Sequence, residues 1–488
     1  MNLFITSGGI QHDFAENASG VYYYEGDTLV SHAMTISGIT NSGTIIVESG
    51  GLVQDIAPYS PATSSTLIEV NSGGKAEDLA LCRKMTINNG GTADNINAQG
   101  MRSTMGSWTP ELTVNAGGSL TNLEAYAANI TVKQGASVGG ALLNAFSVMD
   151  LYGDGVNITV NGYHGPSPSM NSYIGTWHGT LNLYGKASNT TIARYGSVNI
   201  HSGAVASGIN NQGELQINSG ASASDITVSG GGISCAGNAK NIIISKGGAT
   251  ILDGAVVENV QVHIGALYIS SGASVTDIKE NGGVVQVDSG AVVTFVQHTA
   301  ENLTLTGSVT IHSGTVFKNA TANNASVHIY SGGVADSILT NKGTLRIESG
   351  GSASIAFTPW EKAAITSDAG AVITDLSPTS HMYLGNVKSG LLGPANSYTE
   401  VTKSNYIHIY NSCYASGFKV NGGTFIMSQG ASATETSINS SGRVSVCYGA
   451  QAQNAIVNAG GNMIVSNGGK ADTTTVYSRG NISVLGGA

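Results

Sequence analysis

A short segment recurs along almost the whole chain, at intervals of 17 to 19 residues. Four copies near the C-terminus read FIMSQGASA (425–433), VSVCYGAQA (444–452), MIVSNGGKA (463–471) and ISVLGGA (482–488). The apolar residues at the third position of each copy are 19 residues apart, at Met427, Val446, Val465 and Val484. A repeat of this length is typical of a stacked solenoid, whereas propeller blades need a period of roughly 40 residues.

Each repeat reads as two short strands joined by a tight turn. Its first half alternates apolar and polar residues, which predicts a β-strand with one buried face. A Gly-Gly or Gly-Ala pair follows, where the backbone turns sharply and often needs φ > 0. A later apolar residue, such as Ile226 or Ile278, begins a second buried strand. Because one unit cannot bury its own apolar face, the copies must stack, which predicts an all-β parallel solenoid of about two dozen rungs.

Composition supports this fold and narrows the partners. Gly accounts for 67 of 488 residues and charged residues for 10%, against about 25% charged in ordinary globular chains. We expect one β-helix domain over residues 1–488, with N-terminal rungs and a cap in residues 1–40. The net charge is −10 and no Lys/Arg-rich run occurs, so nucleic acid and anionic membranes are poor partners. No apolar run is long enough to span a bilayer.

The N-terminus and the cysteines carry two further expectations. MNLFITSGG has neither a basic region nor a long apolar core, so it is not predicted to be a signal peptide, and an export signal is not expected within this sequence. The four cysteines are widely spaced and form no CxxC motif. They are therefore expected to be free, partly buried thiols rather than metal ligands or disulfide partners. The sequence predicts no cofactor and no metal site.

Irregular insertions interrupt the repeat near residues 55–65, 99–110, 161–179, 357–362 and 389–405. They hold all three tryptophans, Trp108, Trp177 and Trp360. Insertions in a solenoid become loops that project from the stacked rungs, and loops on a rigid scaffold often carry function.

The insertion at 161–179 is the richest in candidate ligand-binding residues. It holds Tyr163, His164, Tyr173, Trp177 and His178. These aromatic and polar groups predict a patch that binds a sugar or a peptide. The alternative is that the aromatic rings pack back onto the rungs and fix a long loop. The two histidines lack a convincingly spaced third ligand, so a metal site is not expected there.

The repeat resembles that of the AIDA-type (diffuse-adherence) autotransporter adhesins, in which V-x-x-G-G-x-A recurs about every 19 residues, as in VSNGGKADTTTVYSRGNISV (465–484). The resemblance implies a right-handed parallel β-helix displayed on a bacterial surface or outside the cell. It also implies adhesion to host-cell or bacterial surface molecules or glycans, and self-association of the chain.

Three functions remain open from the sequence. A non-catalytic adhesive rod is favoured, because charge is low and no catalytic cluster is evident. A polysaccharide-acting enzyme or phage-type depolymerase would need paired carboxylates; Asp150 and Asp154 are the best pair, while Glu48, Glu69 and Glu348 are scattered among rungs. A glycan-binding or fibre-scaffold module would use the aromatic loops.

Overall fold

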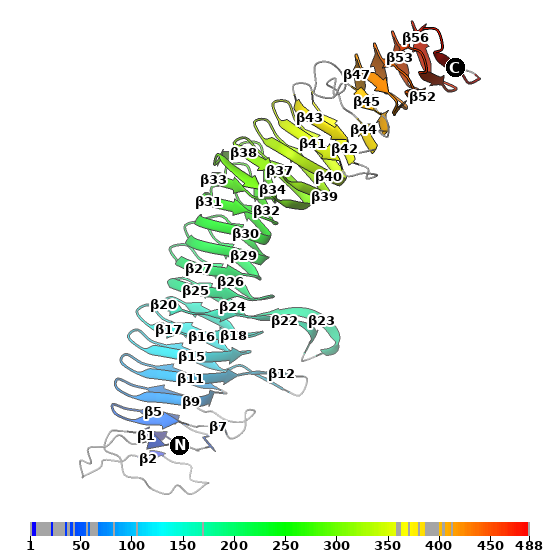
Figure 1. The fold of residues 1–488 in the computed structure, drawn as a ribbon. Coiled ribbons are helices and arrows are strands. Elements are labelled where there is room, and N and C mark those ends of the chain that lie inside the picture. The colour runs from blue at the N-terminus through cyan, green and yellow to red at the C-terminus, as the bar shows by residue number, and fades with distance from the viewer. Residues whose placement is uncertain are drawn as a thin grey trace. The chain divides into compact units, whose positions relative to one another are not determined.

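The structure is a computed structural model in which every regular element of the described residues is a β-strand (Figure 1). The chain forms two compact units. The first unit comprises residues 1–260, 265–276 and 286–292, and the second comprises residues 261–264, 277–285 and 293–488. The structure describes residues 2–5, 21–22, 35–36, 40–41, 44–54, 57–58, 67–81, 83–103, 106–167, 170–357, 363–368, 371–378, 381–385, 400–402, 406–410 and 413–486.

Successive rungs pair in parallel and in register. In the first unit β24 (Thr180–Leu183) pairs with β26 (Ser197–Ile200), which pairs with β28 (Glu214–Ile217). Each strand turns alternate residues inward, as the repeat predicts: Leu181 and Leu183 in β24 are fully buried. These registers confirm the predicted all-β parallel solenoid.

Hydrogen bonds between polar side chains at equivalent positions of neighbouring rungs give the number of residues in each rung. Asn199 donates to Asn182, 17 residues earlier, and Asn259 donates to Asn241, 18 residues earlier. Asn458 donates to Asn439, 19 residues earlier. One rung is shorter than the sequence predicts, because Asn241 donates to Asp225 only 16 residues earlier.

The glycine that follows the first strand is required by the turn. Gly220 has a φ of 77°, and a Cβ there would lie 2.5 Å from Oγ of Ser202 in the preceding rung. A side chain is therefore excluded both by the backbone conformation and by the neighbouring turn.

A second bend divides the strand that follows the turn, and the sequence pattern did not reveal it. Asn189, Asp225, Asn241 and Asn259 sit at this bend with φ between 54° and 58°. Asn and Asp tolerate this left-handed conformation better than other non-glycine residues. The bend brings two inward side chains three residues apart, such as Ala223 and Ile226, which are both buried.

The C-terminal rungs of the second unit are three-sided. Their strands form three separate parallel sheets. One sheet has β44 (His381–Gly385), β46 (Tyr406–Tyr410), β49 (Thr424–Met427), β52 (Arg443–Val446), β55 (Asn462–Val465) and β58 (Asn481–Val484). The second has β45 (Glu400–Thr402), β48 (Lys419–Asn421), β51 (Ser437–Ile438), β54 (Ile456–Val457) and β57 (Thr475–Val476), and the third has β47 (Tyr414–Ser416), β50 (Ser432–Thr434), β53 (Gln451–Gln453) and β56 (Lys470–Asp472).

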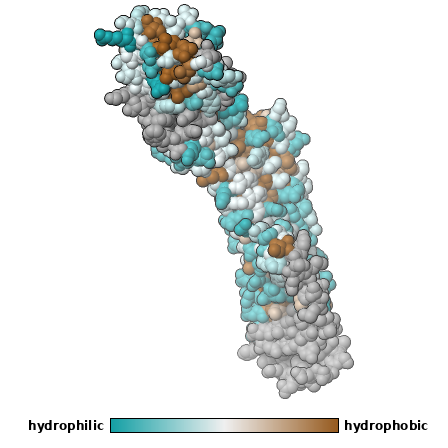
Figure 2. All heavy atoms as spheres, turned by 90° about the vertical axis from the view of Figure 1, so that its right-hand side faces the viewer, coloured by the Kyte–Doolittle hydropathy of each residue, from teal (hydrophilic) through white to brown (hydrophobic). Residues whose placement is uncertain are grey.

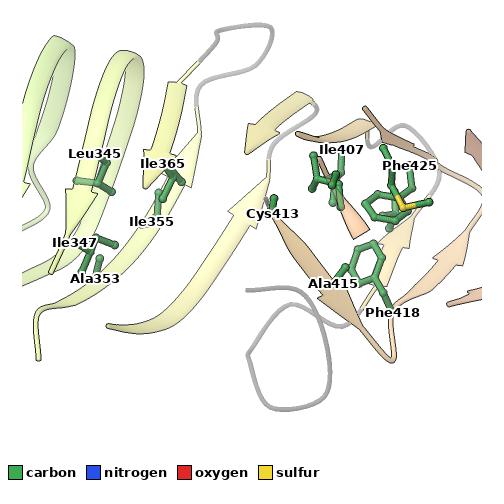
Figure 3. Packing of buried hydrophobic residues seen from close by; sticks show 14 of the residues in the cluster. Leu345, Ile347, Ala353, Ile355, Ile365, Ile407, Cys413, Ala415, Phe418 and Phe425 are labelled. Carbon is green, nitrogen blue, oxygen red and sulfur yellow. The ribbon is translucent and has the colours of Figure 1, made fainter. Parts of the chain in front are cut away.

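The core of the second unit includes bulky aromatic side chains. Phe418 and Phe425 are fully buried, with ring centroids 5.2 Å apart (Figure 3). Phe317 is also fully buried. Within the described residues of the first unit, the core is instead mostly Ile, Leu, Val and Ala.

Cys235 is a free, fully buried thiol and Cys447 a free, half-buried one, in line with the expectation for these thiols; Cys413 is fully buried. Cys82 lies outside the described residues. Across the described ranges, no helix is long and apolar enough to cross a membrane. Most of the predicted N-terminal cap also lies outside those ranges.

Candidate functional site

The 161–179 insertion forms a two-stranded antiparallel hairpin. Its strands are β22 (Gly162–Ser167) and β23 (Met170–His178), and Tyr163 lies opposite Trp177. The hairpin is inserted in the chain between two stacked rungs. Asn182 therefore donates a hydrogen bond to Asp150 of the preceding rung, 32 residues earlier. Figure 1 shows β22 and β23 extending away from the stacked strands.

The base of the hairpin is packed against the rungs. Trp177 is half-buried and stacks on Phe146, with ring centroids 5.1 Å apart. Phe146 in turn meets Tyr126 edge to face at 6.0 Å. Nδ1 of His178 lies 2.8 Å from the backbone oxygen of Tyr195. These two predicted ligand-binding residues therefore position the hairpin on the solenoid.

The outward part of the hairpin leaves aromatic groups exposed. Tyr163 is 46% exposed. His164 is also exposed; its Nδ1 lies 3.0 Å from Oγ1 of Thr176, and its ring stacks on Tyr195 at 5.5 Å. The guanidinium of Arg194 lies 4.8 Å from the centroid of the same tyrosine ring. The exposed hairpin surface thus combines aromatic faces, a cation and hydrogen-bonding groups.

The remaining predicted residues are not placed in this cluster. Tyr173 is in β23, but its side chain is outside the described set, and Trp360 lies outside it altogether. Trp108 ends β13 (Gly106–Trp108), which pairs antiparallel with β12 (Met101–Ser103) in a separate hairpin. Its indole Nε1 donates to the backbone oxygen of Gln99 at 3.3 Å, which holds that hairpin to the rung.

Three of the carboxylates considered for catalysis are partners in contacts between rungs. Asp150 accepts a hydrogen bond from Asn182 at 2.8 Å, and Glu48 accepts one from Asn71 at 3.0 Å. Glu348 lies 2.9 Å from Nε2 of His328. Asp154 is exposed at the start of β20 (Asp154–Val156). Among the described residues, no group of three His, Cys, Asp or Glu is arranged to hold a metal ion.

Two aromatic columns were missed by the sequence reasoning. In the first unit Tyr152, Tyr184 and His201 stack with centroids 4.5 and 4.3 Å apart; this is the first aromatic column. In the second unit Phe295, His312 and Tyr330 stack at 4.5 and 4.2 Å; this is the second aromatic column. A signal was present, since several of these rings directly follow the last apolar residue of a strand, as in Leu183-Tyr184 and Ile329-Tyr330.

The second aromatic column rests on a fully buried carboxylate, Glu280. The hydroxyl of Thr310 donates to Oε1 of Glu280 at 2.7 Å, and the backbone N–H of His312 donates to Oε2 at 2.7 Å. Nδ1 of His312 lies 2.8 Å from Oε1. Because each carboxylate oxygen has a partner, the burial of this charge is offset by hydrogen bonds.

Burial and nearby charges shift the pKa values of Tyr184 and Tyr330 in the columns and of His328, which stacks beside Tyr330. Partial burial lowers the pKa of His328, although its bond to Glu348 acts in the opposite direction. Burial, and then the charge of Glu348, raise the pKa of Tyr330. Burial and the carboxylate of Asp150 raise the pKa of Tyr184.

The fold defines the chain as a parallel β-solenoid, and one protein family matches part of it. The model of the family described as adhesin of the bacterial autotransporter system, probable stalk, matches residues 416–480. This match confirms the resemblance to AIDA-type repeats over that stretch.

A crystal structure of a TibA fragment, residues 55–350, hyper-glycosylated by TibC, is among the similar solved structures. It is 19% identical, the alignment covers 84% of this chain and 99% of that chain, and the TM-score is 0.19. None of the curated proteins compared with the chain matches it.

Proposed function

We propose that this chain is a stalk of a bacterial adhesin, displayed on the cell surface or outside the cell, that mediates adhesion or self-association without catalysis. The observation that carries the proposal is the match of residues 416–480 to the adhesin stalk family. The regular parallel registers of the rungs support it, because a solenoid with nearest-neighbour contacts can be extended rung by rung into a spacer.

The surface and the carboxylates also support this role. Charged residues are 10% of the chain, and the face in Figure 2 is mostly hydrophilic or neutral where its residues are described. The carboxylates Asp150 and Glu48 accept hydrogen bonds from neighbouring asparagines. Paired carboxylates that hydrolyse glycosides must instead face the substrate.

The exposed hairpin surface, with Tyr163, His164 and Arg194, is the proposed contact surface for host-cell or bacterial surface molecules or glycans. An exposed aromatic group with a polar tip is suited to contact, since it offers a large apolar area at low conformational cost. A second copy of the chain is the other proposed partner.

The test is adhesion of bacteria that display the full protein, compared with a deletion strain and with a Tyr163→Ala/His164→Ala variant. We expect the deletion strain to lose adhesion or aggregation, and the hairpin variant to lose most of the adhesion. A matched control is Tyr448→Ala, since Tyr448 is 69% exposed on another part of the chain.

Two outcomes would overturn the proposal. One is a purified chain that stays monomeric in light scattering over a concentration series and binds neither cells nor glycans. The other is release of new reducing ends from a glycan panel, which would establish the alternative of a polysaccharide-acting enzyme.

A further inference from the structure

In the first unit, the strand end and turn at residues 232–238 carry smaller outward side chains than the corresponding part of the preceding rung. The strand is the end of β29 (Ser222–Cys235), and its outward positions are Gly232 and Ser234. Gly232 lies opposite Glu214 of the preceding rung and Gly248 of the next, in β30 (Asn238–Ile251). Two adjacent rungs thus present glycine where the preceding rung presents a long side chain.

Neither glycine is demanded by the backbone. Gly232 and Gly248 both lie outside the left-handed, positive-φ region that favours glycine. A Cβ on Gly232 would meet nothing within 4 Å, and one on Gly248 would meet only a backbone oxygen at 3.4 Å. A glycine inside a strand often marks a bulge or a place where another molecule approaches closely. The pairing of β29 with β30 has a register shift between Ser229 and Gly232, and the open space above both glycines also leaves room for a ligand.

The turn of the same rung is also shortened. Ala236 and Gly237 alone connect Cys235 to Asn238, whereas residues 218–221 and 252–255 fill the corresponding turns of the two neighbouring rungs. The short turn accounts for the 16-residue spacing between Asp225 and Asn241.

A groove lies on each side of this short turn. The groove on the strand before the turn has a volume of about 290 Å³ and includes Asn199, Glu214, Gln216 and Ser234 in its lining. The groove on the strand after the turn has a volume of about 550 Å³. Ser222 and Asn238 lie in its middle, and Val205 and Val256, which are 46% and 48% exposed, flank them in the neighbouring rungs. We call the two grooves together the short-rung recess.

We propose that the short-rung recess binds a neutral oligosaccharide. This inference rests on the proposed role in adhesion and names a class of ligand for it. Amide and hydroxyl side chains supply both donors and acceptors to sugar hydroxyls. The exposed valines offer apolar area to the C–H faces of the sugar rings. Such a mixture of apolar walls and a few convergent polar groups is typical of ligand sites.

Charge and backbone pairing favour a neutral glycan over other chains. The charged residues in the lining are Glu214, Glu258 and Lys240, so their sum is negative and an anionic ligand would be repelled. The strands that floor the recess already pair with a strand on each side, so an extended peptide finds no free edge to join.

The test is affinity electrophoresis of the full chain in gels that contain dextran, mannan, galactan or amylose, with heparin and a mixed peptide library as contrasts. We expect at least one neutral polysaccharide to retard the wild-type chain. Gly232→Leu and Asn238→Trp should abolish the retardation, because they fill the two grooves from positions where the fold leaves space. Thr180→Leu is the matched control, since Thr180 occupies the same outward position two rungs before Glu214.

A removal variant keeps the test valid if a filling variant misfolds. Glu214→Ala should weaken binding of the retarding polysaccharide about tenfold, the loss expected for one hydrogen bond to a charged group. Retardation by heparin alone, by no polysaccharide, or equally for wild type and all variants would overturn the inference. If adhesion is retained in Gly232→Leu but lost in the Tyr163→Ala/His164→Ala variant, the recess is not the glycan site, while the proposed function stands.

Discussion

The two aromatic columns occupy similar edges of the two units but are supported differently. The first column, Tyr152, Tyr184 and His201, lies beside a ladder in which Asn199 and Asn182 lead to Asp150. The second column lies against carboxylates, with Glu280 buried beneath His312 and Glu348 beside His328. The first column thus lies beside amides that end on a single carboxylate, whereas the second lies beside carboxylate–histidine pairs. We therefore expect the second unit to be more sensitive to pH and to loss of a single partner.

Removal of the buried carboxylate should have the largest effect. Glu280→Ala leaves the Thr310 hydroxyl and the His312 backbone N–H without their acceptor. We expect a local loss of about 3–5 kcal/mol, because one partner of a buried network is removed. Hydrogen exchange of peptides covering residues 277–312 measures it. Asp150→Ala is the control and should cost about 1 kcal/mol; equal losses would show that burial of the charge does not distinguish the units.

Acidification should loosen the second unit before the first. The pKa of His328 is lowered by burial, and the pKa of His263 is lowered by burial and by Lys279. Between these lowered values and about 6.5, the unfolded chain binds more protons than the folded chain. Stability is therefore fully present above about pH 6.5 and falls as the pH drops through the lowered values. Hydrogen exchange at pH 7.5 and 5.5, corrected for intrinsic rates, checks this.

The control for the pH effect is His328→Gln. This variant should reduce the difference between the two pH values in peptides of residues 321–348. Protection that is lost equally in both units, or not at all, would contradict the comparison.

Removing an amide in the first unit should cost more stability than removing an exposed ion pair in the second. Asn182 joins two hydrogen bonds between rungs, so Asn182→Ala should cost about 0.5–1.5 kcal/mol locally. Arg346 and Asp368 are 3.7 Å apart and largely exposed, so Arg346→Ala should cost at most about 1 kcal/mol and less in salt. Exchange rates at 0.05 and 0.5 M NaCl compare the two; a larger effect of Arg346→Ala at both would refute this ranking.

The rate at which the buried thiols are labelled should report local opening of each unit, without any substitution that changes stability. Burial raises the pKa of Cys235 to about 11, so its reactive thiolate is scarce and its side chain is inaccessible. Cys413 is equally buried in the second unit, while Cys447 is half-buried. Labelling with a dipyridyl disulfide, read by mass spectrometry, should reach Cys447 before Cys235 and Cys413. Rapid labelling of Cys235 in the native chain would show that the first unit opens more easily than its contacts suggest.

The fold was largely predictable because the repeat fixes it locally. Alternating apolar residues fix the inward faces, and a Gly-Gly or Gly-Ala pair such as Gly220-Ala221 fixes the turn. Stacking follows from the need to bury each rung. The candidate hairpin was predictable as an insertion because residues 161–179 interrupt the repeat with an aromatic-rich segment. The role of Trp177 in holding its base was not, because its partner Phe146 is 31 positions away and belongs to another rung.

The sequence by itself determined the parallel solenoid, the approximate rung length and the positions of the insertions, because these depend on patterns within one or two repeats. Only the tertiary structure decided what meets across rungs. It placed Glu280 beneath His312 and set Gly232 beside Gly248. The reason is that contacts between rungs depend on the exact register and turn length of each copy, and a one-residue change in either moves every outward side chain relative to its neighbours.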